Sequence, residues 1–583
     1  MSGIVGIWNL DGRPVERGLL GRLSASLAHR GPDGEGLWVE GPAGFACQLL
    51  RVTPESATES QPLVSSSGAV LVFDGRLDNR EELLAALKDS PGICADSPDP
   101  ALVLAAYETF GDRFPERLNG DFALGLYDPR RQQLLLARDA LGVRPLYYCR
   151  AGDTFLFASE IKAILAHPQV HAEPNDDVLA AYLLFRLGGR FQDPQGATLF
   201  EGVFGLLPGC MAILTPERFL TRRYWDFDPS RQTRLGCFEE YAEAFREKFE
   251  QALRRRLRSA YPVVVSVSGG LDSSSVLCMA ETLRRREPDR YPPLVGMSFT
   301  PLDGSPADES AYLMPIEHDY GIAIERLPLR KYRGVVHRCK EVTWQVEIPF
   351  LEVDWNTYEQ LRRAARERGA RLLLGGQWAD QILYDQAYLI DLFFSLAWGR
   401  IASDVREFRR WQADVDPRTY WREFFYQLVV YHVPDGLAAL VRRLQAKFLP
   451  YYLDRPWFLD SFRQRARRYA SRQVSIPLGA FATAHARALY HMARSRYYGV
   501  ELETENKLAS MYGIDIAFPF LDRDLIQFLL EIPGEMSTYK GVPKALLRQG
   551  LRGVLPEAIA SRTWKGDWTH LEDEAMAQLY PEI

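Results

Sequence analysis

The chain has 583 residues, of which 47% are hydrophobic, and a formal net charge of −6 at pH 7. This length predicts two or more domains with sizeable cores. So small a charge argues against nucleic acid and against an anionic membrane surface as partners. No stretch has the features of a signal peptide or a membrane span, so we expect a cytoplasmic protein. The seven cysteines form no Cys-x-x-Cys pair, which argues against a zinc site or a disulfide framework.

Residues 1–207 favour an α+β sandwich domain. Short apolar and aromatic runs alternate with turns such as Asp11-Gly12 and Asp128-Pro129, a pattern typical of antiparallel strands. Residues 208–235, around Tyr224-Trp225-Asp226, have the features of a linker. The strands that we expect in the first domain are 3–9, 45–52, 69–73, 122–127, 133–137, 147–149 and 154–157.

Residues 236–583 favour a second domain, in which strands and helices alternate. Apolar residues recur every three or four positions from Phe238 to Leu257, which predicts an amphipathic helix. This alternation predicts a doubly wound parallel α/β sheet, followed by a helical C-terminal part, with the ligand outside the carboxyl ends of the strands. We expect strands at 263–267, 294–299 and 371–376, and a helix at 358–368 with a solvated basic face formed by Arg362, Arg363, Arg366 and Arg368.

The loop after the first of these strands, Ser268-Gly269-Gly270-Leu271-Asp272-Ser273-Ser274, predicts a nucleotide site. Two glycines allow a sharp turn that brings backbone N–H groups close to an anion, and the following helix points its positive end at the same place. Asp272 would repel a phosphate unless a divalent cation lay between them, so we expect ATP together with Mg²⁺. The loop is not a Walker A sequence, because it lacks the Gly-Lys-Ser/Thr ending.

This loop resembles the pyrophosphate loop of N-type ATP pyrophosphatases, which split ATP into AMP and pyrophosphate. A series of motifs in the first domain resembles, in the same order, the glutaminase domain of glutamine-dependent asparagine synthetases. The resemblance covers nearly the whole chain and implies an Ntn-type glutaminase-like sandwich followed by a synthetase domain. The motifs of the first domain are His29-Arg30-Gly31-Pro32-Asp33, Gln61-Pro62, Phe73-Asp74-Gly75, Asp121-Phe122-Ala123, Ala137-Arg138-Asp139 and Phe157-Ala158-Ser159-Glu160.

The first domain departs from that family at the residues of amide hydrolysis. Ser2 stands where the family has a nucleophilic cysteine after Met1, and Asp74 replaces an asparagine that supplies oxyanion donors. An ionised carboxylate cannot donate a hydrogen bond, so we expect this domain to be inactive. Arg51 and Asp99 fall where the family holds the carboxylate and the amino group of glutamine.

In the second domain, the resemblance implies a metal and phosphate site. Asp272 and Asp380 would hold Mg²⁺, with a helix cap as the alternative for Asp380. Lys544 would face the phosphates, and Arg548 would either act with it in catalysis or brace a helix. The residues that would bind the nucleotide are Ser266, Ser268, Gly269, Gly270, Leu271, Asp272, Ser273, Ser274, Ser298 and Gly376.

Other residues of the second domain concern the amine that would attack the activated carboxylate. Gln377 and Gln381 replace two acids of the family, the first of which is tied to amine chemistry. Asp308-Glu309 resembles an acidic pair that starts a helix near the nucleotide. The candidates for a general base are Glu347, Glu501, Glu503 and Glu505.

These departures favour a ligase whose amine does not come from glutamine. The chain resembles most closely the lasso peptide cyclases, which adenylate an Asp or Glu side chain of a leader-free precursor peptide and join it to the peptide's N-terminal amine in a macrolactam. A leader peptidase and a leader-binding protein would be further partners. The segment from Tyr384 to Val500 is dense in aromatic residues, which either form a helical core or line a peptide groove. The alternatives are an ammonia-dependent asparagine synthetase and a β-lactam synthetase-like ligase.

Overall fold

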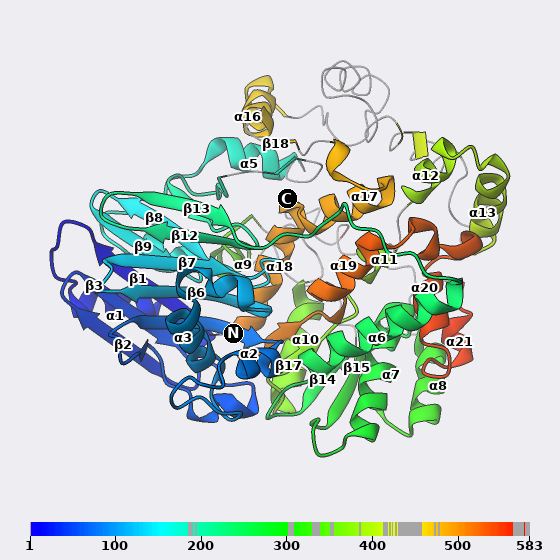
Figure 1. Cartoon of the computed structure of the whole chain (residues 1–583), viewed down its shortest axis with the longest axis horizontal. Helices are drawn as coiled ribbons and strands as arrows, with labels where there is room; N and C mark the ends of the chain where they lie inside the picture. Colours follow the sequence, from blue (N-terminus) through cyan, green and yellow to red (C-terminus); the bar gives the residue numbers. More distant parts are fainter. Residues whose placement is uncertain are drawn as a thin grey trace.

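The computed structural model describes residues 2–184, 195–300, 308–328, 338–349, 355–383, 386–411, 458–471 and 478–563, with a few short pieces between these ranges. The described chain forms two domains that lie side by side, the first in blue and cyan and the second in green to red (Figure 1). The predicted order, an α+β sandwich followed by an α/β domain with a parallel sheet, is confirmed.

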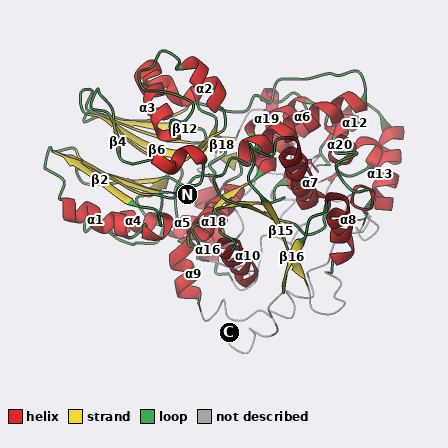
Figure 2. Cartoon of the chain, turned by 90° about the horizontal axis from the view of Figure 1, so that it is seen from below, coloured by secondary structure: helices red, strands yellow, loops and turns green. Residues whose placement is uncertain are grey.

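The first domain stacks two six-stranded antiparallel sheets between two layers of helices (Figure 2). Phe45 of one sheet and Val72 of the other belong to the apolar layer between the sheets. Leu23 of α1 (Arg17–Ala25) packs on the outer face of the first sheet, and Leu102 of α3 (Asp99–Phe110) packs on that of the second. The remaining helices of this domain are α2 (Arg80–Ala86), α4 (Ile161–Leu165) and α5 (Asp176–Leu183).

Each sheet consists of strands from several parts of the domain. The first sheet has the order β11-β8-β9-β1-β3-β2, with bounds Val203–Gly205, Tyr147–Ala151, Thr154–Ala158, Gly3–Asn9, Ala43–Gln48 and Glu35–Glu40. The second has the order β13-β12-β7-β6-β5-β4, with bounds Phe219–Arg223, Cys210–Leu214, Gln133–Arg138, Gly120–Asp128, Val70–Leu77 and Leu63–Val64.

The second sheet continues past the predicted domain boundary at residue 207. β12 pairs with β7, and β13 pairs with β12, so the sandwich extends to Arg223 and the connection to the second domain begins after it. The sequence did not predict β13 because Phe219 and Leu220 are both exposed, and a strand without alternating burial gives no period-two pattern.

Five parallel strands form the sheet of the second domain, in the order β16-β15-β14-β17-β19. The strand order reverses between β14 and β17, and in open α/β sheets ligands bind at the carboxyl ends of the strands at this point. The loop at 268–274 leaves β14 and the turn at 375–380 leaves β17, so both lie at this place. The strand bounds are Ile324–Pro328, Leu294–Thr300, Val263–Ser266, Leu372–Leu374 and Asp515–Ala517.

Helices surround this sheet. The predicted helix at 238–257 is α6 (Phe238–Arg256), and the predicted helix at 358–368 is α10 (Trp355–Glu367). Within the described part of the chain, no helix is long and apolar enough to cross a membrane. The other helices used below are α7 (Leu271–Arg286), α8 (Ser310–Tyr320), α9 (Cys339–Val346), α11 (Ala379–Leu383), α12 (Tyr388–Phe394), α13 (Trp398–Trp411), α17 (Ala484–Ala493), α18 (Arg496–Ser510) and α20 (Ala545–Gly550).

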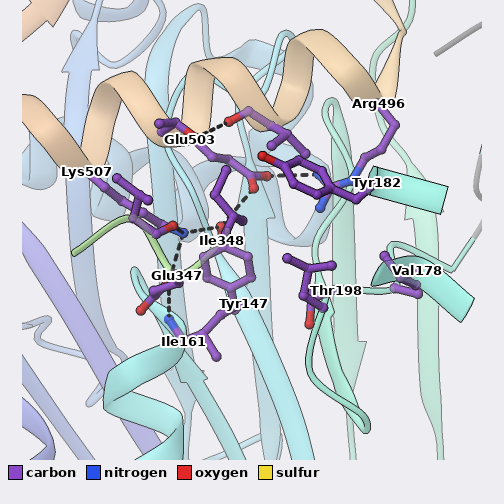
Figure 3. A pocket seen from close by; sticks show the side chains of 15 residues that line it. Tyr147, Ile161, Val178, Tyr182, Thr198, Glu347, Ile348, Arg496, Glu503 and Lys507 are labelled. Carbon is purple, nitrogen blue, oxygen red and sulfur yellow. Dashed lines mark hydrogen bonds and ion pairs between the residues drawn. The ribbon is translucent and has the colours of Figure 1, made fainter. Parts of the chain in front are cut away.

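Buried ion pairs join the two domains at several places, among them α18 and β19. Arg138 Nη2 of the first domain lies 3.1 Å from Glu503 Oε1. The Tyr147 hydroxyl donates to Glu503 Oε2 at 2.8 Å (Figure 3). Arg144 pairs with Asp515 of β19 at 2.8 Å. These side chains are almost wholly buried, so each charge depends on its partner across the interface.

We expect Glu503→Gln to destabilise the whole chain. Burial opposes the charge of Glu503, but Arg496 and Arg138 outweigh it and hold the pKa of this carboxyl at about 2. Replacing the Glu503 carboxylate leaves two buried arginines without their partner, which typically lowers the free energy of unfolding by about 3–5 kcal/mol. Thermal and denaturant unfolding measure the loss, with Glu501→Gln, two residues away on the same helix, as the matched control.

The pH dependence of unfolding gives a second readout of the same pair. Because the folded-state pKa of Glu503 lies below its ordinary value of 4.5, its contribution is complete above pH 4.5 and is lost as the pH falls toward 2. The difference between the wild type and Glu503→Gln should therefore shrink over that range. Equal unfolding of both variants and the wild type at neutral pH would contradict the role of this pair.

Candidate active site

The loop between β14 and α7 has the geometry of an anion site. Gly269 has a φ of 74°, which favours glycine, and a Cβ there would lie 3.0 Å from the Cβ of Tyr312. The helix α7 begins at Leu271, directly after Gly270. Its first N–H groups have no partner within the helix and point toward the loop, as in other phosphate-binding helix starts.

The residues of this loop differ in their access to a ligand. Ser268 is exposed, whereas Asp272 and Ser273 are half-buried. The Oγ atoms of Ser268 and Ser273 lie 3.0 Å apart, and Ser273 Oγ also accepts the N–H of Ser268. Ser274 is fully buried, and Leu271 packs into the core, so these two shape the loop from behind.

The two strand ends next to this loop hold the other predicted nucleotide residues. Ser266 is half-buried at the end of β14, and Ser298 of β15 is 3% exposed. Gly376 follows β17 and lies directly against the loop, because a Cβ there would come within 2.5 Å of the N atom of Ser273. Glycine is therefore required at Gly376 for the β17 turn to reach the loop.

Three distant segments meet at Lys544. Its Nζ donates to Asp272 Oδ1 at 2.7 Å and Oδ2 at 2.6 Å, and lies 2.5 Å from Asp380 Oδ1. Burial opposes the charge of Lys544, but Asp272 and Asp380 outweigh it, so its pKa is raised above the ordinary value. The sequence motifs therefore predicted three side chains that the fold brings into direct contact.

The pair Asp272 and Asp380 fits a magnesium ion. Both carboxylates converge on the ammonium group of Lys544, so this place already favours a cation. Within the described residues, no group of three or more His, Cys, Asp or Glu side chains could hold a metal. A metal here would need oxygens from a ligand, which suits Mg²⁺, because it takes one or two carboxylates together with phosphate oxygens.

Arg548 binds backbone carbonyls before and after α20. Its guanidinium donates to the carbonyls of Pro543 at 2.9 Å, Ala560 at 2.6 Å and Arg562 at 3.0 Å. Burial lowers its pKa to about 10, and its guanidinium carbon lies 4.5 Å from the centre of the Trp411 ring. Its contacts favour the alternative of bracing, since they fix the backbone on both sides of α20, which Lys544 precedes.

Arg562 is a loop contact to which the sequence assigned no role. Its Nη1 donates to the carbonyl of Gly269 at 2.8 Å, and it forms an ion pair with Glu309. Its guanidinium carbon lies 4.0 Å from the centre of the Tyr312 ring. Glu309 directly precedes α8, as expected for an acid at the start of a helix. Its ion pair with Arg562 connects the start of α8 with the loop.

The candidates for the general base differ in their partners, and two of them, Glu347 and Glu503, are labelled in Figure 3. Glu347 accepts the N–H groups of Ile161 at 3.0 Å and Lys162 at 2.7 Å, and Glu503 is held by arginines. Glu505 pairs with Arg362, which is 1% exposed and so is not part of the predicted solvated basic face. All four carboxylates have partners, because a side-chain hydrogen bond from Tyr497 reaches Glu501.

Glu501 has the properties of a base. Burial raises the pKa of its carboxyl above the ordinary value, and the neighbouring Glu505 adds to this effect. It follows Tyr498 by one turn of α18, and the Tyr498 ring packs against Trp378 with a centroid distance of 5.1 Å. Trp378 lies two residues before Asp380, so α18 packs against the turn that leads to Asp380, and Glu501 on this helix is the candidate base.

The predicted hydrolase residues of the first domain are engaged in internal contacts. Asp74 is fully buried, and its Oδ2 accepts from Arg30 Nη2 at 3.2 Å. Ser2 Oγ accepts the N–H of Leu50 at 3.2 Å. Arg51 donates to the carbonyls of Asp33 and Glu59, and Asp99 is held by Arg80 and Arg258. Where the family has an oxyanion donor, this chain has Asp74, whose carboxylate accepts a hydrogen bond from Arg30.

The aromatic residues of the segment 384–500 are divided between core and surface. Phe424 is buried and lies 6.2 Å from Phe393, measured between ring centres. Phe394, Trp398 and Phe425 are each more than half exposed, although Phe393 packs against Trp398 at 4.6 Å. Other members of the predicted set lie outside the described residues: Tyr384, Tyr420, Tyr426, Tyr431, Tyr451, Tyr452 and Trp457.

Comparisons with known proteins show the family. Residues 244–580 match the family described as asparagine synthase, and residues 1–225 match a glutamine amidotransferase domain. The chain belongs to the asparagine synthase family. It is an ATP-dependent, AMP-forming carbon–nitrogen ligase with an amidotransferase-type first domain.

The similar curated proteins carry two kinds of name. "Asparagine synthetase [glutamine-hydrolyzing] 3" of Bacillus subtilis is 24% identical over 96% of this chain and 86% of its own length. "Amidase chry2" of Gibberella zeae is 31% identical over 61% of this chain and 53% of its own length. "Amidase chyE" of Penicillium rubens is 28% identical over 61% of this chain and 53% of its own length.

We expect Lys544→Met to lower the rate of pyrophosphate release at least about 100-fold, because it removes the cation that stabilises charge on the phosphates. Lys540→Met is the matched control, since Lys540 is also a lysine with positive φ but is exposed. Pyrophosphate is measured with a coupled assay at saturating ATP. Equal rates for the two variants would remove Lys544 from the mechanism.

Proposed function

We propose that the chain is an ATP-dependent peptide cyclase of the lasso type. It adenylates an Asp or Glu side chain of a precursor peptide and forms an isopeptide bond with the peptide's N-terminal amine. The observation that carries this proposal is a contrast between the two domains. Lys544, Asp272 and Asp380 form a complete cluster in the second domain, whereas Asp74 in the first domain is an acceptor tied to Arg30.

The chemistry proceeds in two steps. A carboxylate oxygen of the peptide attacks the α-phosphorus of ATP, and the bond to pyrophosphate breaks while Lys544 stabilises the departing charge. The N-terminal amine then attacks the acyl carbon, AMP leaves, and Glu501 takes the proton of the amine. Mg²⁺, held by Asp272 and Asp380, would neutralise charge on the phosphate oxygens.

One observation supports a substrate larger than an amino acid, and another supports a different amine. Phe394, Trp398 and Phe425 expose aromatic surface of the kind that binds peptides with little loss of side-chain entropy. Gln377 stands where the family has an acid tied to amine chemistry, which favours a different amine. A leader peptidase and a leader-binding protein of the same pathway would supply the peptide.

The second candidate is an ammonia-dependent asparagine synthetase. The similarity to a Bacillus subtilis asparagine synthetase over 96% of the chain favours it. A β-lactam synthetase-like ligase would use the same adenylation chemistry with an amine on a small substrate.

Mass spectrometry distinguishes these functions. We expect that incubation with ATP, Mg²⁺ and the linear precursor peptide yields AMP and a peptide that has lost one molecule of water. The product should resist aminopeptidases, because its N-terminal amine is in the ring. Lys544→Met serves as the negative control. Asparagine formed from aspartate and ammonia, with no change in the peptide, would contradict the proposal in favour of the second candidate.

Glu501→Gln should separate the two steps. Adenylation does not need a base for the amine, so the first equivalent of pyrophosphate should still be released at the wild-type rate. Formation of the cyclic product should fall about 100-fold or more, because general-base catalysis typically contributes that much. Rapid-quench measurements of pyrophosphate and cyclic peptide in one sample test this. A loss of both in equal proportion would exclude Glu501 as the base.

A further inference from the structure

An apolar pocket lies where the two domains meet, on one side of Trp378. Its wall combines side chains of the first domain, up to Arg223 of β13, with side chains of the turn after β17 and of α17 and α18. The Asp272–Lys544–Asp380 cluster is not part of this lining in the described residues, so the pocket is a separate site. The apolar lining residues are Leu141, Leu207, Trp378, Met492, Leu502 and Leu521.

Positive charge surrounds this apolar wall. Four arginines line the pocket: Arg138, Arg223, Arg494 and Arg496. Asp226 pairs with Arg223 and Arg494, and Glu503 pairs with Arg138 and Arg496. Among these six described side chains, the guanidinium groups outnumber the carboxylates by two. An apolar ligand group next to a negative charge complements such a pocket.

Trp378 connects the pocket with the reaction centre. Its φ of 77° is an outlier for so large a side chain, and such strain persists only where surrounding contacts fix it. The ring is held by Tyr498 at 5.1 Å and Phe518 at 6.3 Å, measured between ring centres. The Trp378 carbonyl accepts the N–H of Ile382 at 3.1 Å, at the start of the helix that carries Asp380.

We propose that this pocket binds an apolar side chain of the peptide substrate, in the part of the peptide that also carries the carboxylate to be activated. The inference rests on the proposed cyclase function. Trp378 lines the pocket and lies only two residues before Asp380 in the chain. A peptide side chain anchored in the pocket would therefore keep the neighbouring carboxylate of the peptide at the adenylation site. Trp378 is then a specificity-determining residue of the site.

Gly499 is a position from which a larger side chain can enter the pocket. It lines the pocket from α18, and a Cβ there would meet nothing closer than Arg496 Nη1 at 3.8 Å. Gly499→Phe therefore adds a ring to the pocket, and Gly499→Ala is the matched control that adds one methyl group. Both changes replace glycine within a helix by a better helix former, so both chains should fold.

The first test uses the fluorescent probe 1-anilinonaphthalene-8-sulfonate, which joins apolar rings to a negative charge, on the full chain. We expect Gly499→Phe to raise the Kd of the probe at least tenfold, while Gly499→Ala stays near the wild type. Trp398→Ala removes a ring from the exposed aromatic surface and controls for binding there. Equal affinities of the wild type and Gly499→Phe, or a loss confined to Trp398→Ala, would overturn the proposal.

The second test uses the linear precursor peptide. Gly499→Phe should raise the KM for the peptide at least tenfold and leave the KM for ATP unchanged, a split that general unfolding would not produce. An unchanged KM for the peptide would overturn the assignment of the pocket to the substrate. If the wild type does not convert the peptide at all, the cyclase proposal fails, whereas the probe experiment still decides whether the pocket takes an apolar anion.

Discussion

The active site depends on one charge arrangement, in which the ammonium group of Lys544 lies between the carboxylates of Asp272 and Asp380. Two acids so close together would repel each other without a cation, so the lysine stabilises the site before any ligand arrives. The geometry requires a glycine at Gly376 for close approach of the two strand ends. Arg548 and Arg562 then fix the backbone around the lysine and around the phosphate loop.

Charge pairing also explains why the first domain remains, although its hydrolytic residues differ from those of the family. Its arginines Arg138 and Arg144 are buried and form ion pairs with Glu503 and Asp515 of the second domain. Glu503 belongs to α18, the helix whose Tyr498 packs against Trp378, two residues before Asp380. The first domain therefore contributes to the position of the synthetase site, and its loss would leave buried charges without partners.

Much of the fold and of the site could be predicted from the sequence. The Ser268–Ser274 loop predicted a strand, a turn and a helix, and the family resemblance connected Asp272 with Lys544 from 272 residues away. The sequence could not reveal that Arg362 is buried, because its partner Glu505 is distant in the chain. Nor could it separate Glu501 from Glu503, since burial and pairing across domains give these two carboxylates opposite pKa shifts.

The central claim is that the ligase activates a carboxylate for an amine that glutamine does not supply. Glutamine with a heavy nitrogen isotope in its side-chain amide, added with ATP, Mg²⁺ and the linear precursor peptide, tests this claim most directly. We predict that the product contains no heavy nitrogen and that no glutamate is released while AMP and the cyclic peptide accumulate. Heavy nitrogen in an amide product, or glutamate released at the rate of AMP formation, would contradict the claim.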